Sequence, residues 1–168
     1  MNQELLSNYN DYNNEQFVNR KGYMMIKKIQ QHLVMNDIKP SHQRIKIYQY
    51  LIEHRNHPSV DMIYQELVQT IPTLSKTTVY NTLQLFLEKE IAIMITIDEN
   101  ETRYDADTSV HGHFRCNNCD RIYDLRLNTA AWELDSIEGY EISESHIYFK
   151  GLCPQCLKNG AMGESRER

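Results

Sequence analysis

Apolar residues in the first half of the chain recur at the three- and four-residue spacing of amphipathic helices. The first such pattern runs from Tyr23 to about Asn36, and three further patterns begin just after Ser41, Ser59 and Ser75. Serine is a preferred helix N-cap because its hydroxyl accepts a hydrogen bond from a free amide of the first turn. We therefore expect four helices in this part of the chain.

The pattern becomes that of a β-hairpin after the fourth helix. Residues 91–97 (IAIMITI) are rich in β-branched side chains, residues 98–101 (DENE) predict a turn, and residues 102–104 (TRY) predict a second strand. Helices followed by a hairpin are typical of a winged helix-turn-helix, whose recognition helix enters the major groove of DNA. The same pattern also fits a small helical domain whose hairpin only packs at its edge.

The last third of the chain alternates short strands with one helix. Strands are expected within residues 113–116, 121–125 and 140–153, and a helix is expected over residues 129–137. This region has few apolar residues for an independent core. We therefore expect a bound metal ion and a subunit interface to complete it.

The composition of the chain supports the division that the apolar pattern predicts. Residues 1–22 are rich in asparagine and lack a regular apolar period, which predicts a poorly ordered N-terminal extension. Basic and acidic residues are balanced in 23–104, whereas 105–168 carries most of the net charge of −5. We predict an α+β fold, with an N-terminal winged helix-turn-helix DNA-binding domain over 23–104 and a small α/β dimerisation domain over 105–168. The negative total excludes a DNA binder that relies on a strongly basic surface.

No apolar run is long enough to cross a membrane, and the N-terminus has no apolar signal-peptide core. We therefore expect a cytoplasmic protein with no membrane partner. In such a reducing compartment, closely spaced cysteines favour metal binding over structural disulfides.

The four cysteines form two Cys-x-x-Cys pairs, Cys116 with Cys119 and Cys153 with Cys156. Each pair has the spacing of a metal-binding knuckle, and Zn²⁺ accepts four thiolates in a tetrahedron. Four thiolates leave no open coordination position, so we predict a structural zinc ion. A redox dithiol pair and an iron–sulfur cluster are the competing interpretations, and the surrounding sequence supports neither.

A second group of metal-ligand residues lies beside the first cysteine pair. His111 and His113 are two residues apart, so on a strand both imidazoles lie on the same face. Asp105 and Asp124 flank them. Imidazole and carboxylate ligands suit Fe²⁺, Mn²⁺ or Zn²⁺. The same four residues are also typical of a solvated sheet edge.

Five segments, taken in order, resemble the ferric uptake regulator (Fur) superfamily of metal-responsive bacterial repressors: NHPSVDMIYQEL, LSKTTVYNTLQLF, TRYDAD, HGHFRCNNC and CPQC. The resemblance implies a winged-helix DNA-binding domain, a C-terminal dimerisation domain, a structural zinc ion on the four cysteines and a regulatory metal ion between the domains. By motif, it implies that the regulatory metal is held by His57, Asp105, His111, His113 and Asp124.

The carboxylate ligands indicate a branch of this superfamily. Iron-uptake repressors usually carry glutamate at the two positions that hold Asp105 and Asp124 here. The pattern resembles the peroxide-stress regulators (PerR), which implies that Fe²⁺ in the site reacts with hydrogen peroxide and that a ligand histidine, His57 or His111, is oxidised. An iron- or manganese-responsive metal-uptake regulator is the alternative of the same class.

The chain departs from the family pattern at two places. Residues 41–44 read SHQR instead of Thr-Pro-Gln-Arg, although Ser41 keeps the cap. Asp120 replaces the glycine that usually follows the first cysteine pair. Neither change touches a predicted ligand.

A mononuclear metalloenzyme is a third interpretation, since three histidines and two carboxylates also suit a catalytic metal. No general base or substrate pocket accompanies them, so we predict that the chain is not an enzyme. We predict a homodimeric repressor that binds a double-stranded DNA operator and takes hydrogen peroxide as its signal. The candidate DNA contacts lie on the second and fourth predicted helices: Arg44, Lys46, Lys76, Thr77, Thr78, Tyr80 and Asn81.

Overall fold

The computed structural model describes residues 18–98, 100–127, 140 and 145–160. The chain divides into two compact units, residues 1–40 and 41–168. The first unit contains helix α2 (Val18–Met35), which begins before the apolar pattern that starts at Tyr23. Residues 1–17, most of the predicted extension, lie outside the described residues. The domain boundaries expected from composition therefore stay predictions.

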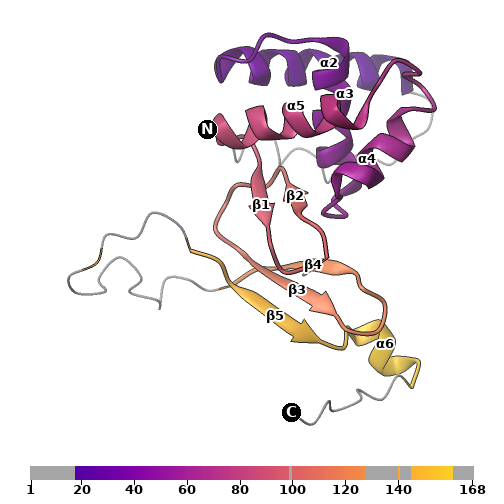
Figure 1. Ribbon diagram of the computed structural model, residues 1–168, viewed down its shortest axis with the longest axis vertical. Helices are drawn as coiled ribbons and strands as arrows, with labels where there is room; N and C mark the ends of the chain where they lie inside the picture. The colour runs from indigo at the N-terminus through magenta and orange to yellow at the C-terminus, as the bar shows by residue number, and fades with distance from the viewer. Residues whose placement is uncertain (1–17, 99, 128–139, 141–144, 161–168) are drawn as a thin grey trace. The chain divides into compact units, whose positions relative to one another are not determined.

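Three helices open the second unit: α3 (His42–His54), α4 (Val60–Leu67) and α5 (Lys76–Glu88) (Figure 1). The predicted serine caps are confirmed. The hydroxyls of Ser41, Ser59 and Ser75 each accept a hydrogen bond from the amide three residues later. Local chemistry thus sets where each helix begins.

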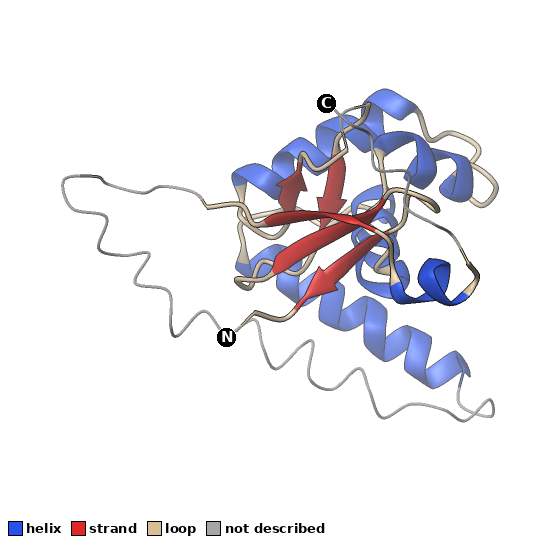
Figure 2. Ribbon diagram, turned by 90° about the horizontal axis from the view of Figure 1, so that it is seen from below, coloured by secondary structure: helices blue, strands red, loops and turns tan. Residues whose placement is uncertain are grey.

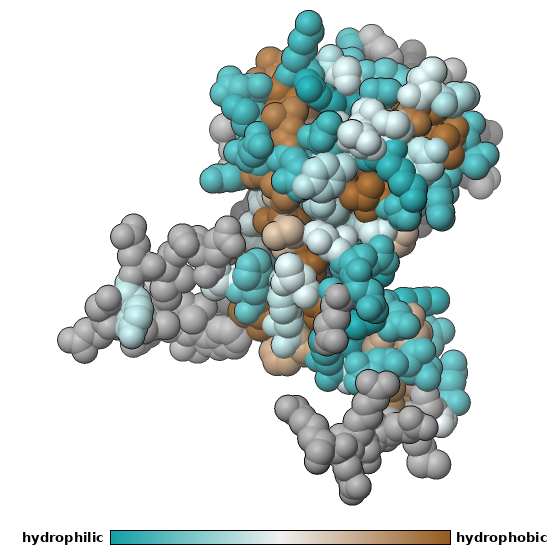
Figure 3. Space-filling model, viewed as in Figure 1, coloured by the Kyte–Doolittle hydropathy of each residue, from teal (hydrophilic) through white to brown (hydrophobic). Residues whose placement is uncertain are grey.

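The apolar sides of α3, α4 and α5 form a common core. Val79, Leu83 and Phe86 of α5 are fully buried. The rings of Tyr48 and Phe86 pack edge to face with their centroids 5.4 Å apart. Tyr80, a candidate DNA contact, is exposed. On the face seen in Figure 3, hydrophobic residues of the helical part lie in small groups between hydrophilic ones.

The predicted hairpin is also confirmed. Strand β1 (Ile93–Ile95) pairs antiparallel with β2 (Arg103–Asp105), so that Ile93 faces Asp105 across the ladder. Tyr104 is almost completely buried, and its amide donates to the carbonyl of Pro58 at 3.0 Å. This bond holds the loop between α3 and α4 against β2.

The remaining strands form a three-stranded mixed sheet with the order β4-β3-β5 (Figure 2). Strand β3 (Gly112–Cys116) pairs antiparallel with β4 (Ile122–Leu125) and parallel with β5 (Tyr148–Gly151), which the short helix α6 (Pro154–Lys158) follows. The architecture is therefore α+β, as predicted. The helix predicted over residues 129–137 lies outside the described residues.

The register of this sheet assigns its side chains to two faces. His113 lies opposite Asp124, and Phe114 lies opposite Tyr123. Because successive side chains of a strand alternate, His113 and Asp124 share one face while Phe114, Tyr123 and Cys116 share the other. None of the described helices combines the length and apolarity that a membrane crossing requires.

Candidate metal centres and DNA-binding helix

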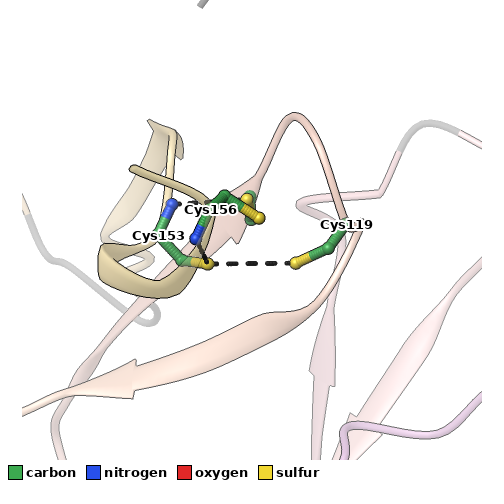
Figure 4. A group of neighbouring side chains, drawn as sticks. Cys119, Cys153 and Cys156 are labelled. Atoms are coloured by element: carbon green, nitrogen blue, oxygen red, sulfur yellow. Dashed lines mark hydrogen bonds between the residues drawn. The ribbon is translucent and has the colours of Figure 1, made fainter. Parts of the chain in front are cut away.

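The four cysteines converge on one face of the sheet and form what we call the thiolate cluster: Cys116, Cys119, Cys153 and Cys156. Cys116 ends β3, Cys119 lies in the turn that follows, and the other two lie at the start of α6. The four sulfurs lie within 4.8 Å of one another, and the Sγ atoms of Cys119 and Cys153 are 3.9 Å apart (Figure 4).

The thiolate cluster has the geometry that a tetrahedral zinc ion requires. With Zn–S bonds of about 2.3 Å, neighbouring sulfurs of such a site lie roughly 3.8 Å apart. Polar hydrogens already point at the sulfurs, since the amide of Cys153 donates to Cys116 Sγ at 3.3 Å and Asn118 Nδ2 donates to Cys156 Sγ at 3.2 Å. A hydrogen bond from Tyr123 lowers the pKa of the Cys153 thiol to about 6. Burial opposes deprotonation of Cys116, but backbone hydrogen bonds that include the one from Cys153 lower its pKa as well. The bond from Asn118 lowers the pKa of Cys156, but its contact with Cys153 and its burial outweigh that bond and raise this pKa. The sulfur geometry and the two lowered pKa values are consistent with structural zinc.

A second cluster, which we call the His/Asp cluster, draws its members from four separate segments: His57, Asp105, His111, His113 and Asp124. His57 comes from the loop between α3 and α4, Asp105 ends β2, and His113 and Asp124 face each other on β3 and β4. One ligand atom from each residue lies within 4.8 Å of all the others. The structure thus brings together all five residues that the sequence predicted as regulatory ligands.

Short contacts run throughout the His/Asp cluster. His57 Nε2 lies 2.6 Å from Asp124 Oδ1 and 3.5 Å from Asp105 Oδ2. The same Asp105 oxygen lies 3.2 Å from His111 Nε2 and 3.6 Å from His113 Nε2. The Nε2 atoms of His111 and His113 are 3.0 Å apart. A single oxygen of Asp105 is therefore the common partner of all three imidazoles.

The backbone of His57 is strained in a way that positions its imidazole in the cluster. His57 has φ of 46°, in the left-handed region that non-glycine residues rarely adopt. Its side chain is only 2% exposed. Its Nδ1 is buried with no hydrogen-bond partner in the part of the chain that the structure describes. Such strain is typical of functional sites, where the surrounding structure holds an unfavourable conformation in place.

Charge within the cluster is balanced by protons. Burial disfavours the imidazolium of His57, but hydrogen bonds to Asp105 and Asp124 outweigh it and raise the pKa of His57 to about 9. The hydrogen bond to Asp105 raises the pKa of His111 to about 9 as well. Burial favours neutral Asp105, yet its hydrogen bonds with His111, His113 and His57 hold its pKa well below the ordinary value. At neutral pH and without a metal ion, the protonated imidazoles of His57 and His111 therefore supply the positive charge that neutralises the two carboxylates.

The donor set fits a divalent cation of the Fe²⁺, Mn²⁺ or Zn²⁺ class, because it combines imidazole nitrogens and carboxylate oxygens without sulfur. The tautomer of His111 fits as well. Its Nδ1 donates to the carbonyl of Ser109 at 2.7 Å, which leaves the Nε2 lone pair for the cluster once that nitrogen loses its proton. Ser109 and Tyr123 were missed from the sequence. For Tyr123, the alternation of β4, which places it on the face of Cys116, is the signal that would have found it.

The candidate DNA contacts lie on two helices. Arg44 and Lys46 are half-buried on α3, and Lys46 Nζ bonds Gln49 Oε1 at 3.1 Å. On α5, the exposed candidates are Lys76, Thr77, Tyr80 and Asn81. Lys76 Nζ lies 2.8 Å from Asp61 Oδ2 of α4. The hydroxyl of Thr78 is 2.8 Å from that of Ser75, so this side chain belongs to the helix cap.

A helix-turn-helix with a hairpin, joined to a sheet that carries two metal-ligand clusters, defines a metal-dependent DNA-binding regulator. Residues 35–150 match the ferric uptake regulator family, and the chain belongs to that family. It is a metal-dependent transcriptional regulator and not an enzyme, which sets the metalloenzyme interpretation aside. Regulators of this family bind DNA and dimerise.

Several peroxide-responsive regulators are similar to this chain in sequence. The peroxide operon regulator of Bacillus subtilis is 33% identical over 119 residues, which are 69% of this chain and 82% of that protein. The peroxide-responsive repressor PerR of Staphylococcus epidermidis is 30% identical over 121 residues, or 70% and 81% of the two chains. The ferric uptake regulator structure from Helicobacter pylori shares the fold, with a TM-score of 0.63 and 17% identity over 85% of this chain and 95% of that one. By sequence, the chain is similar to the peroxide-responsive repressors.

Proposed function

We propose that the protein is a homodimeric repressor that binds a double-stranded DNA operator when the His/Asp cluster holds Fe²⁺ or Mn²⁺, and that it senses hydrogen peroxide through oxidation of a ligand histidine. The observation that carries this proposal is the 2.6 Å contact between His57 and Asp124. It joins the loop before α4 to β4. A metal ion bound there would fix the helix-turn-helix relative to the sheet.

The metal ligands follow from the two clusters. Zn²⁺ would occupy the thiolate cluster, and the five residues of the His/Asp cluster would hold the regulatory ion. Bound Fe²⁺ would supply one-electron chemistry toward the O–O bond of hydrogen peroxide, for which Mn²⁺ and Zn²⁺ are poorly suited. The two electrons that the peroxide gains overall would come from the oxidised imidazole. Asp105 would orient all three imidazoles through the oxygen that they already share.

DNA affinity would depend on this fixed arrangement more than on net charge. In a two-fold dimer, the position of each α5 sets the spacing of two recognition helices, which must match half-sites a whole number of helical turns apart. The exposed first turns of α5 would contact base edges, and basic residues such as Lys46 would contact phosphates. Preorganisation of this spacing lowers the cost of binding.

Three observations favour the peroxide branch over an uptake regulator. Aspartate occupies both carboxylate positions, and two relatives are named as peroxide regulators. The cluster is also open on one side, because the side chain of Asp124 is 34% exposed while that of His57 is 2% exposed. A small oxidant would approach from the Asp124 side. One oxygen atom of the peroxide would add to an imidazole carbon of His57 or His111, and the other would leave as water.

Mass spectrometry tests the proposal directly. Zinc-replete protein is loaded with Fe²⁺ without oxygen, treated briefly with equimolar hydrogen peroxide and digested. We expect one added oxygen atom on the peptide containing His57 or on the peptide containing His111 and His113, together with loss of operator binding. Mn²⁺-loaded protein is the control and should remain unmodified. Intact histidines with iron-dependent DNA binding would instead establish an iron- or manganese-responsive uptake regulator.

A further inference from the structure

A buried ion cluster lies beside the His/Asp cluster and contains none of its ligands. Asp98, in the turn between β1 and β2, accepts from Arg103 Nη2 at 2.9 Å and lies 3.5 Å from Arg115 Nη2 on β3. The three side chains are 5%, 13% and 17% exposed. Burial favours the neutral acid, but hydrogen bonds from Arg103 and the charge of Arg115 hold the pKa of Asp98 below its ordinary value. Asp98 is therefore a buried carboxylate between two cations.

This ion cluster connects three parts of the second unit. Arg103 Nη1 lies 3.0 Å from Met62 Sδ of α4, so the cluster contacts the helix-turn-helix. Arg115 Nη2 also lies 3.0 Å from Asp120 Oδ1, in the turn that carries Cys119. A continuous line of polar contacts thus runs from α4 through the hairpin to the first cysteine pair. Asp120, the residue that departs from the family pattern, is its last member.

Apolar contacts reinforce the same junction between hairpin and sheet. Ile95 and Ile97 of the hairpin pack with Ile122 of β4, and Tyr148 of β5 lies against this group. The amide of Thr96 donates to the Tyr148 hydroxyl at 3.1 Å. These contacts hold the hairpin to the sheet without a metal ion.

The charges of the ion cluster favour one position of the hairpin relative to the sheet. Arg115 Nε is buried with no hydrogen-bond partner among the described residues. Its other carboxylate, Asp120, is 69% exposed and therefore compensates the charge only weakly. A buried ion pair contributes little net stability but strongly disfavours arrangements that separate its members while leaving them buried. A shift of the hairpin along the sheet would carry Asp98 away with Arg103 and leave Arg115 with only the exposed Asp120 as a carboxylate partner.

We propose that Asp98, held between Arg103 and Arg115, is a positioning residue that keeps the hairpin and α4 against the sheet in the arrangement that lets His57 reach Asp124 before a metal binds. The inference rests on the proposed function, since it assumes that the His/Asp cluster binds a regulatory metal. The apparent affinity of that site scales with the fraction of molecules already in the competent arrangement. Loss of Asp98 then weakens metal binding although Asp98 touches no ligand.

The test compares Asp98→Asn with Glu101→Gln in zinc-replete protein. Glu101 Oε1 also lies 2.9 Å from Arg103 Nη2, but this residue is 42% exposed and belongs to the hairpin itself, so it is a matched control. We expect the dissociation constant for Mn²⁺, measured by chelator competition, to rise about ten-fold in Asp98→Asn, within the usual range of coupling between sites. It should stay within about two-fold of wild type in Glu101→Gln.

A second readout needs no regulatory metal. In Mn²⁺-free protein, the amide of Thr96 should exchange its hydrogen faster in Asp98→Asn than in wild type, because its partner Tyr148 lies on the sheet. The neutral double variant Asp98→Asn with Arg115→Gln leaves no unpaired charge at these two positions, so it remains informative if the single variant folds poorly. It should still bind Mn²⁺ more weakly than wild type, because the ion pair that fixes the hairpin against the sheet is gone.

The outcomes separate the two proposals. Unchanged Thr96 exchange and unchanged Mn²⁺ affinity in folded Asp98→Asn protein overturn the positioning role, as does a fall in melting temperature with no change in either readout. A wild-type protein that binds no Mn²⁺ at the His/Asp cluster overturns the proposed function instead. In that case, Thr96 exchange still decides whether Asp98 holds the hairpin to the sheet.

Discussion

The thiolate cluster and the His/Asp cluster lie on opposite faces of the same small sheet, and they differ in how far apart their members lie along the chain. The thiolate cluster is assembled from two short segments, residues 116–119 and 153–156, which the parallel pairing of β3 and β5 brings together. The His/Asp cluster adds His57, which comes from the helical part before the hairpin.

The two clusters would therefore have different roles: the thiolate cluster would stabilise the fold, and the His/Asp cluster would make the structure depend on whether a metal ion is bound. A metal ion in the thiolate cluster joins elements that are already paired in one sheet, so it stabilises that sheet alone. A metal ion in the His/Asp cluster joins the sheet to the loop before α4. Under the proposed function, its binding free energy would be available to change the arrangement of the helices proposed to contact DNA.

The largest expected effect comes from removing a ligand of the thiolate cluster. Cys119→Ser removes one thiolate, so we expect loss of zinc and of cooperative unfolding of the sheet, because structural zinc contributes on the order of 10 kcal/mol in small zinc domains. Zinc content by elemental mass spectrometry and thermal melting by circular dichroism measure it. Asn118→Ala, which removes only one N–H···S contact, is the control and should keep its zinc. Stoichiometric zinc in Cys119→Ser would contradict a structural role.

The next largest effect comes from removing a ligand of the His/Asp cluster, which should not unfold the protein. His57→Ala should weaken Mn²⁺ binding roughly 100-fold and abolish metal-dependent DNA binding, since a direct ligand matters at least as much as the groups that support ligands. Zinc content should not change. His54→Ala is the matched control, because His54 lies nearby on α3 and bonds the carbonyl of Tyr50 outside the cluster. Equal Mn²⁺ affinity in both variants would argue against His57 as a ligand.

A pH experiment sharpens the comparison in protein without a regulatory metal. The pKa of His57 is raised to about 9 in the folded state, above its ordinary value of 6.5. Its contribution to stability is therefore complete below pH 6.5 and lost as the pH rises through about 9. We expect the free energy of urea unfolding to fall by roughly 2 kcal/mol more in wild type than in His57→Ala between pH 6.5 and pH 9.5. Identical pH profiles would contradict this coupling.

The smallest effect on DNA binding comes from Asp124→Glu, which lengthens the exposed carboxylate of the His/Asp cluster. We expect metal-dependent operator binding to stay within a few-fold of wild type, while histidine oxidation by peroxide slows about ten-fold because the reacting groups are displaced. A gel-shift titration and the mass-spectrometric assay measure the two quantities. Unchanged oxidation would remove the main reason to prefer peroxide sensing over metal uptake.

Local chemistry was readable from the sequence, and long-range pairing was not. The caps at Ser41, Ser59 and Ser75 and the hairpin depend on neighbouring residues, so the pattern predicted them correctly. Arg103 was different. Nothing in the sequence pattern indicated its partners, since the structure pairs it with Asp98 and Glu101, which share no periodicity with it.

The two candidate sites show the same limit. Spacing alone identified the Cys-x-x-Cys pairs and the alternating histidines, because these ligands are close in sequence. His57 entered only through the family resemblance, since a loop histidine beside a proline carries no signal of its own. The contacts of Arg115 with Asp98 and Asp120 had no signal either, because they depend on which strand the hairpin packs against.

The odd separation of His113 and Cys116 along β3 has an evolutionary consequence. Because the two residues are three positions apart, one turns toward each face of the sheet. Insertion or deletion of one residue between them would place both ligands on the same face of the sheet. One of the two sites would then lose its ligand, whichever end of the strand kept its pairing. Substitutions can accumulate in this segment, but single-residue length changes cannot. Descendants of this sequence should therefore vary at Phe114 long before they vary in the number of residues between the two ligands.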